Sequence, residues 1–486
     1  MTDSNRTRMS AVVETTLGTT PTTPRMRKVR FTGESLAYEP QYGQSNDIRD
    51  DRMNSDPYKT NESNKGGVNT EFHFPDDGST LSNFIASSFL SPWSNTPVRY
   101  NDGVTDSVIT DIGTTANTVT FTTGAAFVVG HLVRMSGNAN AANNGLFPVT
   151  TGGTTSFVST GSGFVAETVP TAQSRAKVVG LQGTSGDLVA AVDGITSTTM
   201  NFTTMGLAVG QWIKIGGTGA GFRFANELCN VWARIVAIAA NKLTLDNLPG
   251  TWTTDAGTGK TLRVFFGDRV KHGTTLIGTS IERSFLAQAV PSHILQAGMC
   301  ANQATYTFTS ESAVTAAFDF MGLTGAVNGA GVGSQYDDAP TGGALTSNAS
   351  VGRVAEAGVT LSSPNWVKSA TITINNNLRM KTAVGTVGAV DIGVGEAAVT
   401  VELNTYFGSS ALLAKLLSGA ATNVNLHGRK NSQACIWQVP RLTLTSGTPN
   451  AGGKNQDVML PTKAMASADT LTNTVLLLDR LEFYQD

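Results

Sequence analysis

Short runs of alternating apolar and polar residues dominate this chain, and sustained helical periodicity is nearly absent. In residues 118–122 and 370–374, for example, Thr, Val, Ile and Phe alternate between turns rich in Gly and Asn. A period of two places successive side chains on opposite faces of a strand. The pattern therefore predicts an all-β protein whose sheets have one buried and one solvated face.

Two segments break this pattern and predict short helices. Residues 81–90 place Leu81, Phe84, Ile85 and Phe89 at helical spacing, and residues 412–417 do the same with Leu412, Leu413, Leu416 and Leu417. Each segment is expected to be one amphipathic helix packed on a sheet.

The middle of the chain, residues 105–270, contains a repeat. Residues 118–124 (TVTFTTG) resemble residues 199–205 (TMNFTTM), and each is followed by Val-Gly and an alternating segment, 129–137 and 209–217. We interpret both copies as a strand, a turn and a second strand. The middle segment is thus expected to be an inserted pair of small β modules.

The flanks carry a second repeat, in the order strand, long loop with an Asp-Ile pair, strand, short helix. The first copy runs through residues 28–36, 46–52, 67–74 and 81–90, and the second through 368–378, 390–396, 398–403 and 412–417. Further strands are expected after each copy. The predicted division is a first fold in residues 1–104 and 271–350, an insert in 105–270, and a second fold in 351–486, because an insertion at a loop leaves the host strands free to pair.

Composition and motifs narrow the function. Charged residues make up 14% of the 486 residues and the net charge is −2, which excludes a basic nucleic-acid clamp. The chain has no GxxxxGK[ST], HExxH or GxSxG motif, and its five histidines are scattered. Three distant cysteines form neither a disulfide framework nor a metal pair. We expect no catalytic residue, no cofactor and no metal. The chain has no run of 18 apolar residues, so the sequence predicts no membrane-spanning helix.

Two charged segments are candidates for contacts between copies of the chain. The first is the predicted loop 40–66, where opposite charges alternate, a pattern that suits protein contacts better than catalysis. The second is an N-terminal arm, residues 10–28. The contact candidates are Asp47, Arg49, Asp50, Asp51 and Arg52 in the loop, and Arg25, Arg27 and Lys28 in the arm.

Several segments resemble the tail tube proteins (major tail proteins) of long-tailed, siphovirus-like bacteriophages. They are residues 13–21 with 30–36, 46–52, 375–379, 391–395, 405–407 and, with most specificity, 440–459. The resemblance covers residues 10–104 and 271–486 but not 105–270. The two copies within the chain differ in their long loop. Residues 393–396 of the second copy read Gly-Val-Gly-Glu, where the first copy has Arg49-Asp-Asp-Arg52. The two loops are therefore not expected to make equivalent contacts.

The resemblance implies a structural virion protein rather than an enzyme, with a β-sandwich or barrel fold. Rings would stack into a tail tube, assembled in the host cytoplasm without a membrane, through which double-stranded DNA passes. The implied partners are the tape-measure protein, the tail terminator and the distal tail or baseplate proteins. Family tubes are six folds around, so a chain with two copies would form a trimeric ring with pseudo-sixfold symmetry; a ring of six chains is the alternative.

Strand alternation selects the side chains that would face the channel. They are Thr32, Glu34, Glu71, Thr371, Thr373, Thr400 and Glu402. A face with carboxylates and few cations would repel phosphate, but a register shift by one residue would reverse the assignment. An alternative function is receptor or glycan binding through residues 105–270, with Trp212, Phe222, Phe224 and Trp232 as an exposed platform, although aromatic residues at strand spacing are more often core. A cell-wall hydrolase has no specific support.

Overall fold

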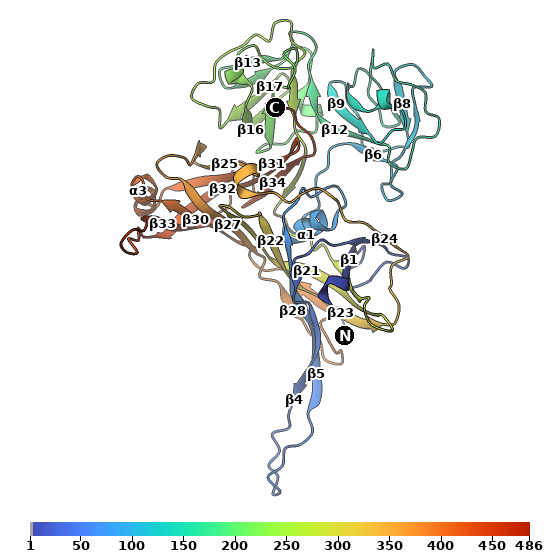
Figure 1. Cartoon of the computed structure of the whole chain (residues 1–486), viewed down its shortest axis with the longest axis vertical. Coiled ribbons are helices and arrows are strands. Elements are labelled where there is room, and N and C mark those ends of the chain that lie inside the picture. The colour runs from blue at the N-terminus through green and yellow to red at the C-terminus, as the bar shows by residue number, and fades with distance from the viewer. Residues whose placement is uncertain (1–2) are drawn as a thin grey trace.

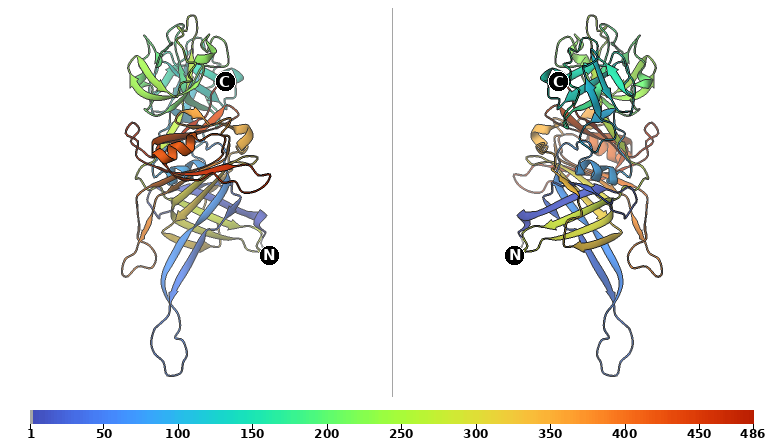
Figure 2. Two further views of the ribbon diagram at one scale, coloured as in Figure 1. Left: turned by 90° about the vertical axis from the view of Figure 1, so that its left-hand side faces the viewer. Right: turned by 90° about the vertical axis from the view of Figure 1, so that its right-hand side faces the viewer.

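The computed structural model describes residues 3–486 as an elongated, mostly β chain. Residues 98–265 lie at one end and the hairpin of β4 (Ala37–Gly43) and β5 (Tyr58–Glu71) projects from the other (Figures 1 and 2). The described residues hold three α-helices: α1 (Thr80–Ser88), α2 (Ser347–Ser350) and α3 (Ala411–Ser418). The predicted all-β class with short helices is confirmed.

The first copy of the fold is an antiparallel ladder. Its strands pair in the order β3 or β4, β5, β22, β21, β20, β1, and α1 lies between β5 and β20 in the chain. The further strands are β1 (Thr7–Val13), β3 (Gly33–Glu34), β20 (Thr279–Phe285), β21 (Ser292–Thr309), β22 (Thr315–Met321) and β23 (Thr324–Asn328), and two strands at the margins are β2 (Arg25–Lys28) and β24 (Gln335–Asp337).

The second copy has the same pairing order. Its strands follow as β27, β30, β33, β32, β31, β25, and α3 lies between β30 and β31. The last strand of each copy also corresponds. In the first copy, β22 and then β23 pair with successive parts of β21. In the second copy, β33 and then β34 pair with successive parts of β32. The strands are β25 (Val351–Glu356), β26 (Val359–Thr360), β27 (Val367–Asn375), β30 (Ala398–Tyr406), β31 (Ala421–Lys430), β32 (Gln433–Gly447), β33 (Met459–Ala466) and β34 (Leu477–Leu481).

One ladder joins the two copies into a continuous sheet. The second half of β21 pairs with β22 on one side and with β27 on the other, from Gln303 opposite Asn375 to Thr309 opposite Ser369. A single apolar core lies behind this sheet, and it includes Phe72 and Trp437, one from each copy, with ring centroids 4.9 Å apart. The two folds therefore share both a sheet and a core.

The two predicted helices pack differently on this core. Every apolar side chain predicted for the first helix is buried, and Ser79 caps α1 by accepting a hydrogen bond from the Ser82 amide at 3.2 Å. In α3 only Leu412 is fully buried, and Leu417 is 79% exposed. The prediction that all four leucines of this helix pack on the sheet is thus wrong, because α3 lies at the margin of the sheet and leaves part of its apolar face in solvent.

Residues 98–265 form sheets of their own. The larger sheet joins two modules through the pairing of β12 with β18. The first module has β6 (Val98–Tyr100), β7 (Ile109–Ile112), β8 (Thr118–Phe121), β9 (His131–Ser136), β10 (Gly145–Pro148), β11 (Ser156–Val158) and β12 (Arg175–Gln182). The second has β13 (Val189–Ala191), β14 (Gly194–Thr196), β15 (Trp212–Ile215), β16 (Trp232–Ala239), β17 (Lys242–Asp246) and β18 (Arg263–Phe265). We call residues 98–265 the insert.

Strand pairing moves both edges of the insert by a few residues. β6 pairs with β12 of the insert, although it lies before the boundary expected at 104. β19 (Asp268–Lys271) pairs with β34, so most of it belongs with the tube fold rather than with 105–270.

Only the second half of the sequence repeat within the insert has the same secondary structure in both copies. β9 and β15 correspond, and each follows a glycine at positive φ, Gly130 and Gly210. The expected strand at 199–205 is instead a 3-10 helix, Phe202–Thr204. The reason is Asn201, which replaces Thr120 of the first copy and accepts a hydrogen bond from the Thr203 amide at 3.1 Å, a local turn that competes with strand pairing.

The expected loop 40–66 is largely a β-hairpin. β4 pairs with the first half of the 14-residue strand β5, and only residues 44–57 at the tip are irregular. The second copy has a shorter hairpin at the same place, formed by β28 (Arg379–Lys381) and β29 (Asp391–Gly393). The sequence shows no apolar–polar alternation here, because both faces of a projecting hairpin are solvated and carry polar residues. The two strands were therefore not predicted.

Candidate functional site

A polar face runs across the joined sheet of both copies. Opposite residues form two rows across β5, β22, β21, β27, β30 and β33: Glu71, Thr315, Thr307, Thr371, Glu402 and Lys463, and then Asn69, Ala317, Thr305, Thr373, Thr400 and Met465. The alternate residues, such as Tyr306, Ile372 and Val401, lie in the core. The structure therefore brings Glu71, Thr371, Thr373, Thr400 and Glu402 together on one surface.

The polar face is rich in hydroxyl groups, and its two rows hold two carboxylates, Glu71 and Glu402, and one cation, Lys463. Lys463 Nζ lies 2.9 Å from Glu402 Oε1, and more than half of each side chain is exposed. Thr305 and Thr373 place their hydroxyl oxygens 3.4 Å apart across the joint between the copies. Sequence reasoning missed Lys463, because only the register of β30 with β33 shows that it neutralises Glu402.

One of the seven predicted channel residues, Glu34, lies elsewhere. Glu34 stands opposite Val68, whose side chain is in the core, so Glu34 does not share the face of Glu71. Its carboxylate instead lies 3.2 Å from Arg283 Nη1. Thr32 is exposed but precedes β3. Grouping Glu34 with Glu71 was wrong, because alternation alone does not fix the register in which β3 pairs with β5.

His73 shows that strand β5 is shorter than the sequence pattern suggests. Alternation places it on the polar face, but β5 ends at Glu71 and His73 is buried. Burial, with a contribution from the charge of Arg30, lowers the pKa of His73 to about 4. The imidazole is therefore neutral at physiological pH.

Each end of the joined sheet leaves a strand edge without a partner among residues 3–486. The ladder between β31 and β32 ends at Thr443, so residues 444–447 pair only with β33. At the other end, β3 and β4 pair only with β5. The free end of β32 corresponds to the part of β21 that pairs with β27, and β3 corresponds to β27.

The hairpin tip exposes the first group of contact candidates. Asp47, Asp50 and Arg52 are exposed, while Arg49 pairs with Asp51 within the tip, Nε to Oδ1 at 2.9 Å. This hydrogen bond from Arg49 lowers the pKa of Asp51. The tip also holds two apolar side chains in solvent: Ile48 is fully exposed and Met53 is 69% exposed.

The second group of contact candidates is engaged within the chain. Residues 10–28 are not a free arm, because β1 pairs with β20, and β2 pairs with β1 and, in parallel, with β24. Arg25 Nε lies 2.6 Å from Asp337, Arg27 lies 3.5 Å from Asp102, and Lys28 lies 2.6 Å from Asp338. Arg25 and Lys28 thus contact residues in and beside β24, and Arg27 contacts the insert.

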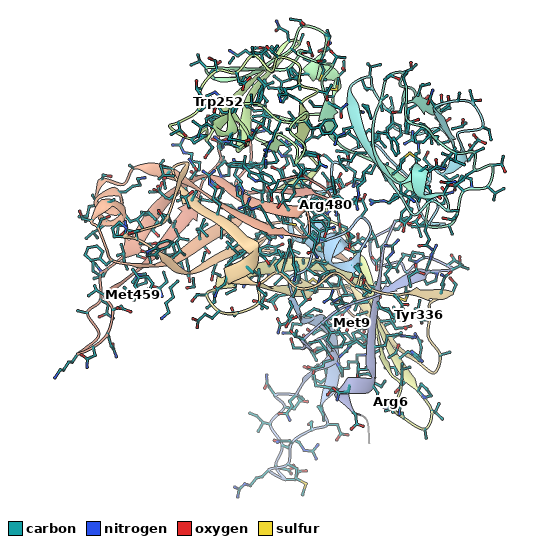
Figure 3. The ribbon with its side chains drawn as sticks, turned by 45° about the horizontal axis from the view of Figure 1, so that its top comes forward. Arg6, Met9, Trp252, Tyr336, Met459 and Arg480 are labelled. Atoms are coloured by element: carbon teal, nitrogen blue, oxygen red, sulfur yellow. The ribbon has the colours of Figure 1, made fainter. Side chains whose placement is uncertain are left out.

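A buried ionic cluster connects the insert to the tube fold. Arg175 and Lys177 on β12 meet Asp77 before α1, Asp268 on β19, Arg480 on β34, and Glu482, and Figure 3 shows Arg480 at this junction. Lys177 Nζ lies 2.6 Å from Asp268 and 2.7 Å from Asp77, and its side chain is 3% exposed. Burial alone lowers the pKa of Lys177, but the three carboxylates outweigh it and raise the pKa.

An apolar contact lies beside the ionic cluster. Leu132, Trp212 and Phe265 of the insert pack with Ile436, Leu481 and Tyr484 of the tube fold. Trp212 and Phe224 are buried, so they do not form an exposed aromatic platform with Phe222 and Trp232. Trp232 packs edge-on against Tyr484 with ring centroids 5.1 Å apart. The core interpretation of these aromatic residues is the better one.

Three further features of residues 3–486 concern metal binding, the thiols and membrane insertion. No group of His, Cys, Asp and Glu side chains within residues 3–486 is arranged to hold a metal ion. The three cysteines are buried, unpaired thiols. In the part of the chain that the structure describes, no helix is long and apolar enough to cross a membrane.

Comparison with known proteins gave one family. A family model described as "Phage tail tube protein" matches residues 4–470, a span that also runs through the insert. A search of curated proteins found no match.

Proposed function

Because the chain belongs to the phage tail tube protein family, we propose that it forms stacked rings whose channel conducts genomic DNA into the host. Membership of the family implies a structural protein of the virion tail that assembles with copies of itself into a tube. The observation that carries the finer proposal is the continuous polar face shared by the two copies. The role is structural rather than catalytic.

The ring is proposed to contain three chains. Within one chain, the two copies of the fold meet where β21 pairs with β27. We use this antiparallel pairing as the template for the contact between neighbouring chains. Residues 444–447 of one chain would pair with the β3 edge of the next in the same way. Three such contacts and three internal joints would close six folds into a barrel, which removes both free edges.

The polar face is proposed to line the channel. Its threonines present hydroxyl groups, and Glu71 and Glu402 outnumber Lys463, so DNA phosphates would find no cationic surface to bind. The apolar side chains behind it remain in the core of each chain. Lys463 makes this channel less acidic than the sequence alone suggests, and Glu71 leaves it with an excess of negative charge.

The hairpin tip is proposed to contact a neighbouring ring. The hairpin projects beyond the rest of the molecule (Figure 1), and Ile48 and Met53 would bury apolar area on contact. The Arg49, Asp50, Asp51 and Arg52 cluster would set the register of that contact. The tape-measure protein, the tail terminator and the distal tail or baseplate proteins are proposed as partners of the finished tube, and assembly in the host cytoplasm is proposed.

The domain division is proposed to follow strand pairing, with the tube folds built from residues 1–104 with 271–350 and from 351–486, adjusted at the edges of the insert. Receptor or glycan binding by the insert is the alternative function. Its buried contact with β32 and β34 favours an insert that is fixed to the tube wall. Binding of the intact purified protein to host cells or cell-wall glycan would favour the alternative.

Electron microscopy of the purified protein tests the proposal. Two-dimensional averages along the particle axis should show hollow rings of three two-lobed chains. Rings of six chains would keep the tube function and contradict the trimer. Compact monomers at high concentration, unchanged when tail-tip complexes are added as nuclei, would contradict the tube.

A further inference from the structure

A basic cavity lies where the second module of the insert meets the second tube fold. Its volume is about 700 Å³, and its walls come from β15, β16, β25 and β31 and from the segments that follow them. Four cations line it, Lys214, Arg223, Arg353 and Arg429, against the carboxylates of Glu227 and Asp486. Arg223 is paired with Glu227 at 3.2 Å, which leaves three cations and Asp486.

The three remaining cations have no carboxylate within 4 Å among residues 3–486. Lys214 is only 6% exposed, and its ammonium donates to one acceptor, the Ile215 carbonyl oxygen at 3.1 Å. An ammonium group has three hydrogen atoms to donate, and a buried charge with so few partners is unfavourable. Burial lowers the pKa of Lys214. The carboxylates of Asp486 and Glu227 act in the opposite direction and the charges of Arg429 and Arg223 act with burial, and the net result is a lowered pKa.

The two guanidinium groups are held in place by the cavity wall. Arg353 donates to the Gly358 carbonyl oxygen at 2.7 Å and lies 5.3 Å from the centre of the Trp212 ring. Arg429 lies 5.8 Å from the Trp232 ring and against the backbone at Gly352, where an added Cβ would be 1.9 Å from Nη2. Glycine at 352 therefore gives Arg429 the space for this position.

Two further polar groups of the wall lack partners. His427 is 1% exposed, and its Nε2 has no hydrogen-bond partner in the described chain; the same holds for Trp232 Nε1. Burial, together with Arg353 and Arg429, lowers the pKa of His427 well below its usual value. The neutral imidazole and the indole thus add hydrogen-bonding capacity beside the cations.

We propose that this cavity binds an organic phosphate, with the phosphate group held by Lys214, Arg353 and Arg429 and the organic part lying along Trp232, Leu248 and Pro249. Guanidinium forks match the oxygens of phosphate, and an ammonium adds a point charge. The volume is in the range of small-molecule sites and exceeds what a bare ion fills. This inference does not depend on tube assembly.

Isothermal titration of the intact purified protein with glycerol 3-phosphate tests the proposal. Wild-type protein should bind one molecule per chain. Arg429→Gln should weaken binding by about tenfold or more, the loss expected for a charge-assisted hydrogen bond. Gly352→Ala should also weaken binding, because it displaces Arg429 without removing a charge. Lys242→Gln, which removes a lysine of the same module that pairs with Asp193 outside the cavity, should bind as wild type does.

Two outcomes would overturn the binding of any phosphate in this cavity. One is the absence of saturable binding to the wild-type protein, a result that does not depend on the folding of any variant. The other is equal binding by wild type and Arg429→Gln. Titration with inorganic phosphate separates the two sources of the anion, since equal affinity for the bare ion would contradict the assignment of an organic ligand.

Discussion

Replacing Lys177 by Met should loosen the insert from the tube fold. The substitution keeps an unbranched side chain that is one atom shorter, and it removes a charge that lies 2.6 Å from Asp268, 2.7 Å from Asp77 and 3.5 Å from Glu482. Three carboxylates would then face only two guanidinium groups, those of Arg175 and Arg480.

The size of the effect follows from burial. Asp268 and Lys177 are almost completely buried, so the uncompensated carboxylate cannot recover hydration. Removing one partner of a buried ion pair lowers the free energy of unfolding by about 3–5 kcal/mol. At about 2–4 °C for each kcal/mol in a unit of 150–250 residues, the melting temperature should fall by about 6–20 °C.

Thermal and urea unfolding of the purified protein measure this change. The matched control is Lys381→Met, which breaks the exposed Lys381–Asp391 pair at 2.6 Å and should change stability by about 1 kcal/mol or less. The double variant Lys177→Met with Asp268→Asn should lose less than the sum of the two single variants, because the second change removes the orphaned charge.

A loss below about 1 kcal/mol for Lys177→Met would refute this reasoning, because it would equal the value of a surface pair. Additive losses in the double variant would refute the direct coupling of Lys177 to Asp268. A small loss for Lys177→Met would mean that the apolar contact around Trp212, rather than the ionic cluster, holds the insert.

Three further changes test other parts of the structure. Ile48→Asp should weaken ring stacking but leave the unfolding of the subunit unchanged, since Ile48 is fully exposed; tube length by electron microscopy is the measurement, and tubes of normal length would contradict the tip contact. Glu71→Lys with Glu402→Lys should leave tubes intact but impair DNA ejection, because Glu402→Lys would face Lys463 and make a cationic patch; normal infectivity would count against the channel assignment. Burial alone raises the pKa of Glu482, but Arg175 and Lys177 outweigh it and lower the pKa to about 2. The stability that Glu482 contributes should therefore be complete above about pH 4.5 and be lost as the pH falls toward 2, and Glu482→Gln should flatten acid unfolding over this window; an unchanged profile would contradict the pairing.

Local patterns determined much of this protein. The alternation in residues 370–374, the helical spacing of Leu81, Phe84 and Phe89, and the order of elements in the flanks were enough to predict an all-β chain with a repeated fold and short helices. These features depend on neighbours within a few residues, and such signals are legible in a single sequence. The segments that resemble tail tube proteins identified the family that the comparison then matched.

Tertiary structure decided what depends on register and on distant partners. Only strand pairing shows that Glu34 stands opposite core residue Val68 and that Lys463 neutralises Glu402. Only folding brings Lys177 to Asp268, and turns a solvated polar stretch into the β4–β5 hairpin. The physical reason is that alternation gives two faces without saying which is buried, and that an ion pair or a strand ladder joins residues far apart in the chain.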